Sequence, residues 1–294
     1  MRALKQVPGL DITAVVTVGD DGGSSGRLRA DRGVLPPGDL RQALAALAGP
    51  DPLSAGLAEL FQHRFGGADA LAGHPVGNLV LCGLMELHPD PVVALDQAAA
   101  LLRVSGRVLP MSRVPIGIEA DVLDEDGKVE VLRGQHAVAI TQRHVEEVRI
   151  LPADPPACVE AVDTIRTADW LIFGPGSWYT SVIPHLLVPD LARAILASPA
   201  RRLVILNLAA EKETASLTVP DHVHALTRYL PGLRADIVLA DGKAVGDPGP
   251  VHGAAESLGA RLVLAPVAVP DGGPRHDPSA LAAALAQILA KASN

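Results

Sequence analysis

Two adjacent acids within a glycine- and serine-rich stretch are the first residues whose types and spacing could do chemistry. Asp20 and Asp21 lie in "GDDGGSSG" (19–26), directly after an apolar run. Mg²⁺ in proteins is bound by one or two carboxylates together with phosphate oxygens. The same residue types also suit a polar loop in which acids and serines cap a helix. Spacing alone leaves both interpretations open, because the stretch matches neither a dinucleotide-binding fingerprint nor a P-loop.

The residues that surround the two acids are of the kinds that bind phosphate. Gly22 and Gly23 allow close approach of the backbone, and successive N–H groups there could form a nest for an anion. Ser24 and Ser25 add hydroxyl donors, and Arg27 can hold phosphate through two parallel hydrogen bonds. Because carboxylates repel a bare phosphate, the stretch predicts a bridging Mg²⁺ that is bound by both acids.

Two further polar stretches follow apolar runs and add candidate ligand contacts. "GPGSWYTS" (174–181) indicates a turn and a helix start, where free N–H groups and the helix dipole favour an anion. Taken alone, it is explained more simply by a plain helix cap. "NLAAEKET" (207–214) opens with an amide at the end of a buried strand, where a polar side chain needs a partner. The candidate residues in these two stretches are Gly174, Gly176, Ser177, Thr180 and Asn207.

Two predicted helix starts supply the remaining candidates. His74 and Asn78 are four residues apart in "AGHPVGNL" and share a helix face. Asp39 and Arg41 in "PPGDLRQAL" are expected near the opening of the same ligand site. Helix capping and a solvent-facing arginine account for these four residues as well. The histidines that show no spacing supporting a metal site are His144, His222, His224 and His276.

Strands that alternate with helices must position these stretches. The run "ITAVVTV" (12–18) is continuously apolar and β-branched, which is typical of a strand buried on both faces. The alternation continues to a closing helix at 278–292 and predicts an α/β fold with a doubly wound, mostly parallel sheet. Ligands of such sheets bind outside the carboxyl ends of the strands. If the strands that precede the three polar stretches are neighbours, those stretches form one cleft.

The middle of the chain changes character. Residues 106–150 predict a small antiparallel β insert within a single domain that spans 1–294. Alternation around "DEDG" (124–127) is a hairpin signal, and "HAVAITQ" (136–142) and "HVEEVRIL" (144–151) are expected to be further strands. The proline- and glycine-rich stretch 242–253 is expected to be a surface loop.

Charge and composition exclude several classes of partner. The net charge is −8 and aromatic residues make up 2% of the chain, so we expect no nucleic-acid partner, which would need a basic surface or base-stacking aromatics. Apolar runs are shorter than the roughly 18 residues that span a bilayer, and the first residues lack the apolar region of a secretory signal. We therefore expect a cytoplasmic protein without a membrane span. The sequence leaves open whether it forms a homo-oligomer.

Five stretches of the chain occur in the order seen in a known family. The chain resembles the gluconeogenesis factor family (YvcK-like, also called UPF0052), which is homologous to the CofD-like 2-phospho-L-lactate transferases that make a precursor of a deazaflavin coenzyme. The resemblance covers residues 1–240, and its first and fourth stretches are highly specific. In order, they are "AVVTVGDDGGSSGRLR", "GVLPPGDLRQALAAL", "GHPVGNLVL", "ADWLIFGPGSWYTSVIPHLLV" and "LNLAAEKET…DHVHAL".

The resemblance implies a Rossmann-like fold that binds a nucleotide-sugar, typically a UDP-sugar, as its small-molecule partner. It also implies a cytoplasmic role in cell shape and cell-wall metabolism during growth on gluconeogenic carbon sources. Asp20 and Asp21 match acids at the metal and phosphoryl site of the transferase branch. By the same match, Asn78, residues 174–177 and Thr180 would line the nucleotide cleft.

Two features depart from the family pattern. Its members begin with a strand and a "GGGTG" loop, whereas "MRALK" resembles the helix after that loop, so the first βα unit is expected to be missing here. A "QPGET"-like loop is replaced by "EKET" (211–214). Three functions stay open. The first is a nucleotide-sugar-binding regulator without turnover. The second is a transferase that moves a phospho-lactyl group from a nucleoside diphosphate carrier, with Mg²⁺ on the catalytic residues Asp20 and Asp21. The third is a fold that binds nothing well.

Overall fold

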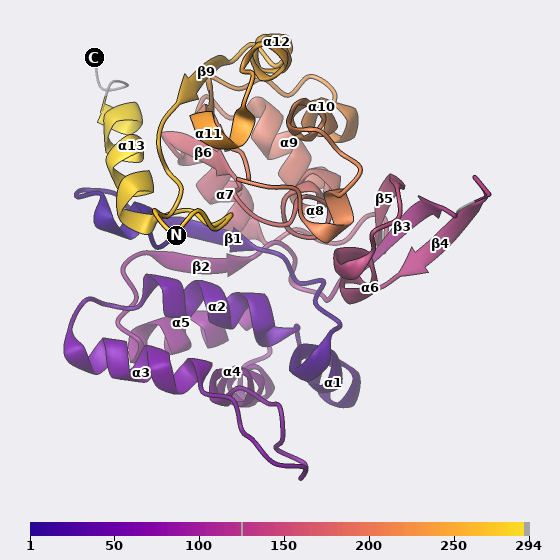
Figure 1. Ribbon diagram of the computed structural model, residues 1–294. Coiled ribbons are helices and arrows are strands. Elements are labelled where there is room, and N and C mark those ends of the chain that lie inside the picture. Colours follow the sequence, from indigo (N-terminus) through magenta and orange to yellow (C-terminus); the bar gives the residue numbers. More distant parts are fainter. Residues whose placement is uncertain (125, 291–294) are drawn as a thin grey trace.

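Parallel strands and helices form two halves of the molecule, and an antiparallel insert lies beside them. The computed structural model describes residues 1–124 and 126–290. Its described strands form a two-stranded parallel sheet, a four-stranded parallel sheet and a three-stranded antiparallel sheet. Figure 1 shows the first half at the bottom, the four-stranded sheet and its helices at the top, and the insert on the right. The predicted Rossmann-like α/β class with a small antiparallel insert is confirmed.

The first half packs helices against a pair of parallel strands. β1 (Thr13–Val16) pairs with β2 (Arg107–Pro110), and the helix at 37–47 contacts both of them. Two helices of this half begin with a proline that follows an aspartate, and the Asp51 and Asp90 carboxylates accept hydrogen bonds from first-turn N–H groups. The helices are α1 (Gly23–Arg32), α2 (Pro37–Leu47), α3 (Pro52–Gln62), α4 (Val76–Leu87) and α5 (Pro91–Leu101).

The second half is a parallel sheet of four strands with helices around it (Figure 1). The strands, in sheet order, are β6 (Trp170–Phe173), β7 (Arg201–Ile205), β8 (Ile237–Ala240) and β9 (Arg261–Leu264). The helices are α7 (Val159–Thr167), the π-helical turn η2 (Trp178–Val182), α8 (Ile183–Leu187), α9 (Pro189–Ala197), α10 (Val219–Tyr229), α11 (Gly242–Val245), α12 (Gly249–Ser257) and α13 (Pro278–Ala290). Two short 3₁₀ turns are η1 (Leu4–Gln6), near the start of the chain, and η3 (Lys212–Thr214), after β7. Of the predicted closing helix, residues 291–292 lie outside the described residues.

The stretch 242–253 contains the helix α11 and part of α12, so its prediction as a surface loop was wrong. The Asp241 carboxylate accepts hydrogen bonds from the N–H groups of Lys243 and Ala244 and thereby begins α11. Pro250 lies in the first turn of α12. Proline is tolerated in a first turn because that N–H group has no partner within the helix.

The insert is the antiparallel sheet β4-β3-β5, formed by β3 (Gly117–Leu123), β4 (Val129–Arg133) and β5 (Val145–Leu151). The predicted pairing on both sides of "DEDG" is confirmed, although Glu125 in that tip lies outside the described residues. The insert begins later than predicted, because residues 107–110 belong to the parallel pair β1-β2.

One predicted strand of the insert is a helix. Residues 136–142 fall mostly in α6 (Gln135–Ile140), so the expected strand was wrong. A positive φ of 101° at Gly134 ends β4, and the Asp21 carboxylate accepts a hydrogen bond from the His136 N–H group. Alternation over so few residues does not distinguish a strand from a short helix, and here a distant carboxylate binds the first turn.

The two parallel sheets are separate within the described strands. β6 and β7 are hydrogen-bonded neighbours, but β1 is bonded to β2 alone. The polar stretches 174–181 and 207–214 therefore follow adjacent strands, β6 and β7. The third stretch, 19–26, follows β1, which belongs to a different sheet. One link between the halves is the His185 ring, whose Nε2 lies 3.0 Å from the Val15 carbonyl oxygen.

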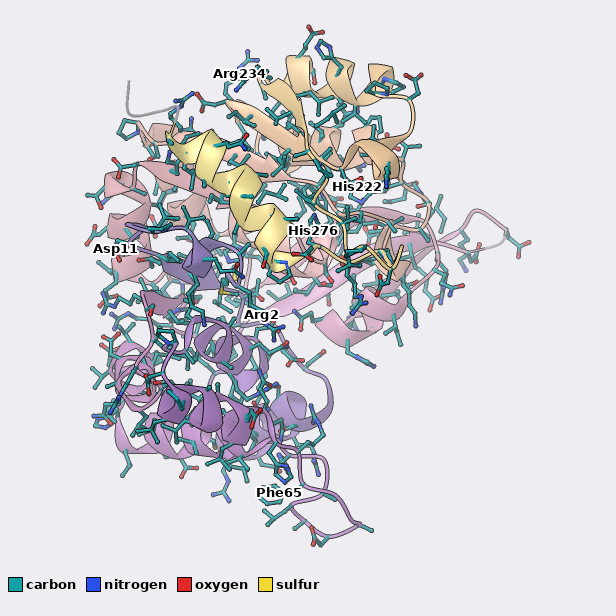
Figure 2. All side chains as sticks on the ribbon, turned by 60° about the vertical axis from the view of Figure 1, so that its left-hand side comes forward. Arg2, Asp11, Phe65, His222, Arg234 and His276 are labelled. Atoms are coloured by element: carbon teal, nitrogen blue, oxygen red, sulfur yellow. The ribbon has the colours of Figure 1, made fainter. Side chains whose placement is uncertain are left out.

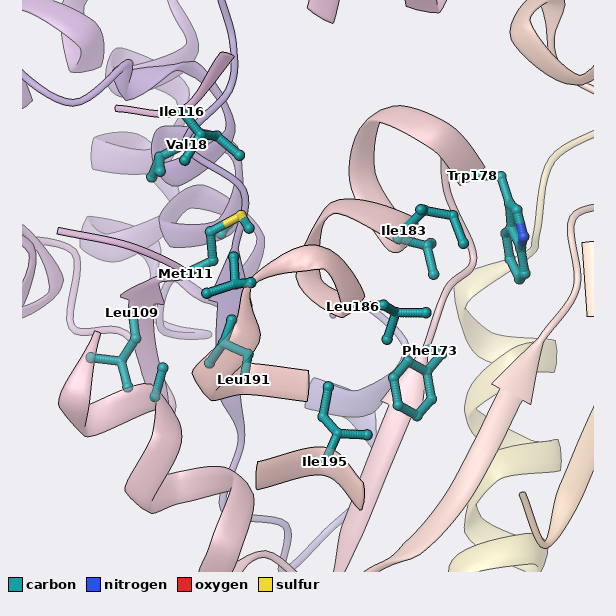
Figure 3. Packing of buried hydrophobic residues seen from close by; sticks show 14 of the residues in the cluster. Val18, Leu109, Met111, Ile116, Phe173, Trp178, Ile183, Leu186, Leu191 and Ile195 are labelled. Carbon is teal, nitrogen blue, oxygen red and sulfur yellow. The ribbon is translucent and has the colours of Figure 1, made fainter. Parts of the chain in front are cut away.

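A shared hydrophobic core holds the halves together. One cluster of buried residues contains side chains of both halves and of the insert. Figure 3 shows Val18 and Met111 of the first half on one side of this packing, with Ile183 and Leu191 of the second half beside them. Within the described residues, no single helix has the length and apolar composition to span a bilayer; one pair, 178–187 and 189–197, passes that test when taken together, but it is bent by 80°.

Candidate functional site

The two acids after β1 are hydrogen-bonded within the protein. Asp20 Oδ1 accepts a hydrogen bond from the Gly22 N–H group at 3.0 Å, and Asp21 Oδ1 accepts one from the His136 N–H group at 2.9 Å. Asp21 also lies against the backbone of Gly134, where an added Cβ would be 2.1 Å from its Oδ2. Asp21 therefore joins the loop to α6. Binding of Mg²⁺ by this pair stays a prediction.

Four predicted ligand contacts form one buried network. Ser24 Oγ lies 2.8 Å from His74 Nδ1 and accepts a hydrogen bond from Asn78 Nδ2 at 2.9 Å. Arg41 Nε donates to Asn78 Oδ1 at 2.8 Å, and another guanidinium nitrogen donates to Gln62. Burial, and then nearby arginines, lowers the pKa of His74, so the ring is neutral at pH 7. These side chains bind one another and hold α1, α2 and α4 together.

Asp39 and Asp20 lie close enough to affect each other. Asp39 accepts hydrogen bonds from Thr17 Oγ1 at 3.0 Å and Gln135 Nε2 at 3.5 Å. Burial, and then the charge of Asp20, raises the pKa of Asp39. Between the acids lies Gly38, where an added Cβ would be 2.4 Å from Asp20 Oδ2. Paired carboxylates in such a setting are a place where a divalent cation would be stabilised.

Three other residues predicted around the first loop have different surroundings. Arg27 donates a hydrogen bond to the Ala72 carbonyl oxygen at 2.8 Å on the exposed side of α1. Ser25 is buried and lies 3.5 Å from Asn78 Nδ2. Gly23 begins α1 with a φ of 46°. The anion nest expected around these residues is thus the first turn of a helix, and its contact with a nucleotide stays a prediction.

The loops after β6 and β7 bind each other through an amide. Asn207 Oδ1 accepts a hydrogen bond from the Gly176 N–H group, and Asn207 Nδ2 donates to the Gly176 carbonyl oxygen, both at 2.9 Å. Gly174 has a φ of 75°, and an added Cβ there would lie 2.7 Å from the Ile205 carbonyl oxygen. Ser177 Oγ donates to Glu211. The structure therefore brings Gly174, Gly176, Ser177 and Asn207 together, as their positions after neighbouring strands predict.

The helix start at Thr180 differs from its prediction. Free N–H groups in this first turn were expected to favour an anion, but the N–H groups of Tyr179 and Thr180 donate to Glu213 Oε1 at 2.8 and 3.4 Å. Burial raises the pKa of Glu213 to about 7. A carboxyl group of the protein itself thus occupies the place expected for a ligand anion. Glu213 was missed because an acid in a polar loop is usually solvated, and only the fold buries this one.

A cavity of about 310 Å³ opens at the ends of β6 and β7. It lies next to the paired Asn207 and Gly176. The segment before α13 also lines it, although the sequence analysis predicted no ligand contact in that segment. His276 in that segment has its pKa lowered by burial. The residues around the cavity are Pro175, Gly176, Asn207, Leu208, Ala209, Ala210, Glu211, Pro274 and His276.

Comparison with known proteins identifies the family. The model of the CofD family, described as 2-phospho-L-lactate transferase CofD, matches residues 1–252. The chain belongs to this family. A Mycobacterium tuberculosis protein is 51% identical over 287 residues, which covers 95% of this chain and 84% of that protein. The Bacillus subtilis gluconeogenesis factor is 38% identical over 248 residues, which covers 84% of this chain and 76% of that protein.

A solved structure of the family agrees with the fold. The crystal structure of a UPF0052 family protein from Bacillus halodurans matches with a TM-score of 0.84 and 34% sequence identity. The match covers 97% of this chain and 93% of that chain. The resemblance to gluconeogenesis factors and to CofD-like proteins, expected from the motifs, is thereby confirmed.

Proposed function

We propose that the protein binds a nucleotide-sugar, namely a UDP-sugar, in the cavity after β6 and β7. The observation that carries this proposal is the position of the 310 Å³ cavity at the carboxyl ends of two neighbouring parallel strands, where α/β proteins bind ligands. Its volume is in the range of small-ligand sites. Asn207 fixes the glycine turn that forms one wall.

The protein acts by binding, as a cytoplasmic regulator of cell shape and cell-wall metabolism during growth on gluconeogenic carbon sources. Relatives named gluconeogenesis factor support a role during growth on gluconeogenic carbon sources. The hydrogen bonding after β1 supports binding without turnover, because Ser24, Asn78 and Arg41 are bonded to each other. These side chains stabilise the packing of α1, α2 and α4, and the ligand is held in the cavity after β6 and β7.

A second candidate is an enzyme of the 2-phospho-L-lactate transferase type. The proximity of Asp20 to the half-buried Asp39 favours it, since a divalent cation would offset the burial and the charge repulsion that together raise the pKa of Asp39. Asp20 and Asp39 would hold Mg²⁺, whereas Asp21 is bonded to α6. The cation would bind phosphate oxygens and stabilise charge on the transferred group. Thr17 and Gln135 would keep Asp39 in place through their hydrogen bonds.

Calorimetric titration with uridine diphosphate N-acetylglucosamine tests the first proposal. We expect heat of binding both with Mg²⁺ and with a chelator, and only a modest change for the Asp20→Asn variant. Absence of binding heat in both buffers would overturn the proposal. Consumption of a deazaflavin acceptor that requires Mg²⁺ and is abolished by Asp20→Asn would establish the second candidate instead.

A further inference from the structure

Helix α4 is apolar on its outer side as well as on its buried side. Figure 1 shows α3 and α4 at the outside of the first half, below α2 and α5, and both α2 and α5 contact β2. The polar side chain Asn78 of α4 is buried in the network with Ser24 and Arg41. A helix that is apolar on all sides is normally enclosed by other elements. The described residues cover the outer side of α4 only in part.

A stripe of apolar residues forms this outer side. Leu87 is 74% exposed, and the other members are partly exposed. They recur every three or four positions and therefore lie along one side of the helix, without a charged side chain among them. The members of this α4 stripe are Val76, Val80, Gly83 and Leu87.

The adjoining helix α3 has a similar outer side. Leu53 and Leu60 are 57% and 49% exposed, and Gly56 lies between them on the same side of the helix. α3 packs against the first turn of α4, where an added Cβ on Gly77 would lie 2.7 Å from the Phe61 ring. By contrast, the described parts of α10, α12 and α13 in the second half expose no large apolar side chain. Clustered exposed apolar side chains mark an interaction site.

Two glycines leave room for another helix at this surface. No atom lies within 4 Å of the place of an added Cβ at Gly56 or at Gly83, and neither residue has a positive φ. Glycine inside a helix is destabilising relative to alanine, and no contact among the described residues requires it at these two positions. A small residue in the contact lets the axes of two packed helices approach closely.

We propose that the α4 stripe, flanked by α3, is a two-fold interface with a second copy of this chain. The two α4 helices pack antiparallel with Gly83 at the axis, so that Leu87 of one copy packs beside Val80 of the partner subunit. The large side chain at one end of the stripe thereby meets the smaller one near its other end, as a self-complementary patch requires.

Charge favours a second copy as the occupant. Glu86, the charged residue of α4, lies next to the stripe and pairs with Arg32 at 3.6 Å, so two identical faces meet without an unpaired like charge. An apolar core that lacks charged side chains is typical of homodimer interfaces. An anionic membrane fits less well, because the net charge of the chain is −8 and α4 has no lysine or arginine on its polar side.

The interface lies away from the cavity of the second half. Figure 2 shows Phe65, in the loop between α3 and α4, well apart from His222 and His276. The proposed dimer therefore leaves the cavity open, and it does not depend on the proposed nucleotide site.

Sedimentation equilibrium of the full chain over a wide range of concentration tests the proposal. We expect the wild type to reach twice the mass of the monomer. Leu87→Glu should weaken dimerisation by about 30-fold or more, because each copy would bury an unpaired charge. Leu196→Glu, at a leucine on α9 that is 43% exposed, is the matched control and should dimerise as the wild type does. A wild type that stays monomeric at every concentration would overturn the proposal, and so would a monomer that binds vesicles of anionic lipid.

Two variants of Gly83 separate close helix packing from general apolar association. Gly83→Leu keeps the stripe apolar and favours the helix, so the thermal melt should not fall, yet dimerisation should weaken about tenfold or more because the added side chain prevents close approach. Gly83→Cys should form a disulfide between two copies on oxidation, since the native Cys82 and Cys158 are buried. Leu196→Cys should not. Unchanged dimerisation of Gly83→Leu without cross-linking of Gly83→Cys would refute the proposed interface.

Discussion

The polar loop after β1 and the polar loops after β6 and β7 have similar compositions but different hydrogen bonding. After β1, Ser24, His74, Asn78 and Arg41 bind one another in a buried network. After β6 and β7, a cavity of about 310 Å³ remains, and buried atoms such as Glu213 Oε2 have no partner among the described residues. The comparison teaches that a dense polar motif can stabilise the fold alone. A cavity and buried polar atoms without hydrogen-bond partners are the better indication of a ligand site.

An asparagine-to-alanine substitution should reduce ligand binding in the second region and reduce stability in the first. The loss of binding is the largest effect that we expect. Asn207→Ala removes both hydrogen bonds to Gly176 and so releases the cavity wall. Affinity for uridine diphosphate N-acetylglucosamine should fall about 100-fold, because the Gly176 N–H and carbonyl groups lose their partners and each unpaired group costs about 1–3 kcal/mol. Calorimetry measures the affinity. A change of less than threefold would argue that the ligand binds elsewhere.

Asn78→Ala should affect folding instead of binding. The substitution takes away the acceptor of the Arg41 guanidinium and the donor to Ser24, which leaves buried polar groups unpaired. We expect a loss of about 1–3 kcal/mol in the free energy of unfolding, measured by urea denaturation, with affinity for the ligand within threefold of the wild type. A protein of full stability that no longer binds ligand would reverse our assignment of the two regions.

The raised pKa of Glu213, in the second region, predicts how the stability of the protein depends on pH. Its pKa of about 7 in the folded protein is higher than the usual 4.5, so the folded state binds the proton more tightly than the unfolded state. Between pH 4.5 and 7, stability should therefore fall as pH rises. Glu213→Gln should remove this fall and be more stable than the wild type at pH 8 by about 1–3 kcal/mol.

Thermal melts from pH 4.5 to 8 measure this effect. Glu256→Gln, at an exposed position on α12, is the control and should follow the wild-type pH dependence. Parallel curves for the wild type and Glu213→Gln would show that Glu213 is ionised over this whole range.

The smallest effect is expected where the first loop meets the insert. Asp21→Ala removes the acceptor of the His136 N–H group and should cost about 1 kcal/mol, as the loss of a helix cap does. Hydrogen exchange should quicken at residues 135–140, with ligand affinity unchanged. Loss of binding in this variant would indicate that Asp21 contacts the ligand directly.

Much of the fold follows from local patterns in the sequence. The apolar run at 12–18 contains β1, and the alternation around "DEDG" is the β3-β4 pairing. The glycines of 174–176 and the amide of Asn207 come together because they follow neighbouring parallel strands. These features depend on periodicity and turn chemistry, which a sequence shows directly.

The features that could not be predicted depend on contacts between distant segments. α6 begins where Asp21, more than a hundred residues earlier, accepts its N–H group. His222 and Glu213 belong to a polar face and a polar loop in the sequence, and only tertiary packing buries them. Each member of the Ser24–Asn78 network was a candidate from its type, but the sequence does not show that the candidates bind one another.

Hydrogen–deuterium exchange with and without uridine diphosphate N-acetylglucosamine tests the central claim most directly. The account predicts that the ligand slows exchange at residues 174–178 and 206–213, around the cavity, and leaves residues 20–26 unchanged. Slower exchange at 20–26, with no change at 206–213, would contradict it and would place the ligand at the loop after β1.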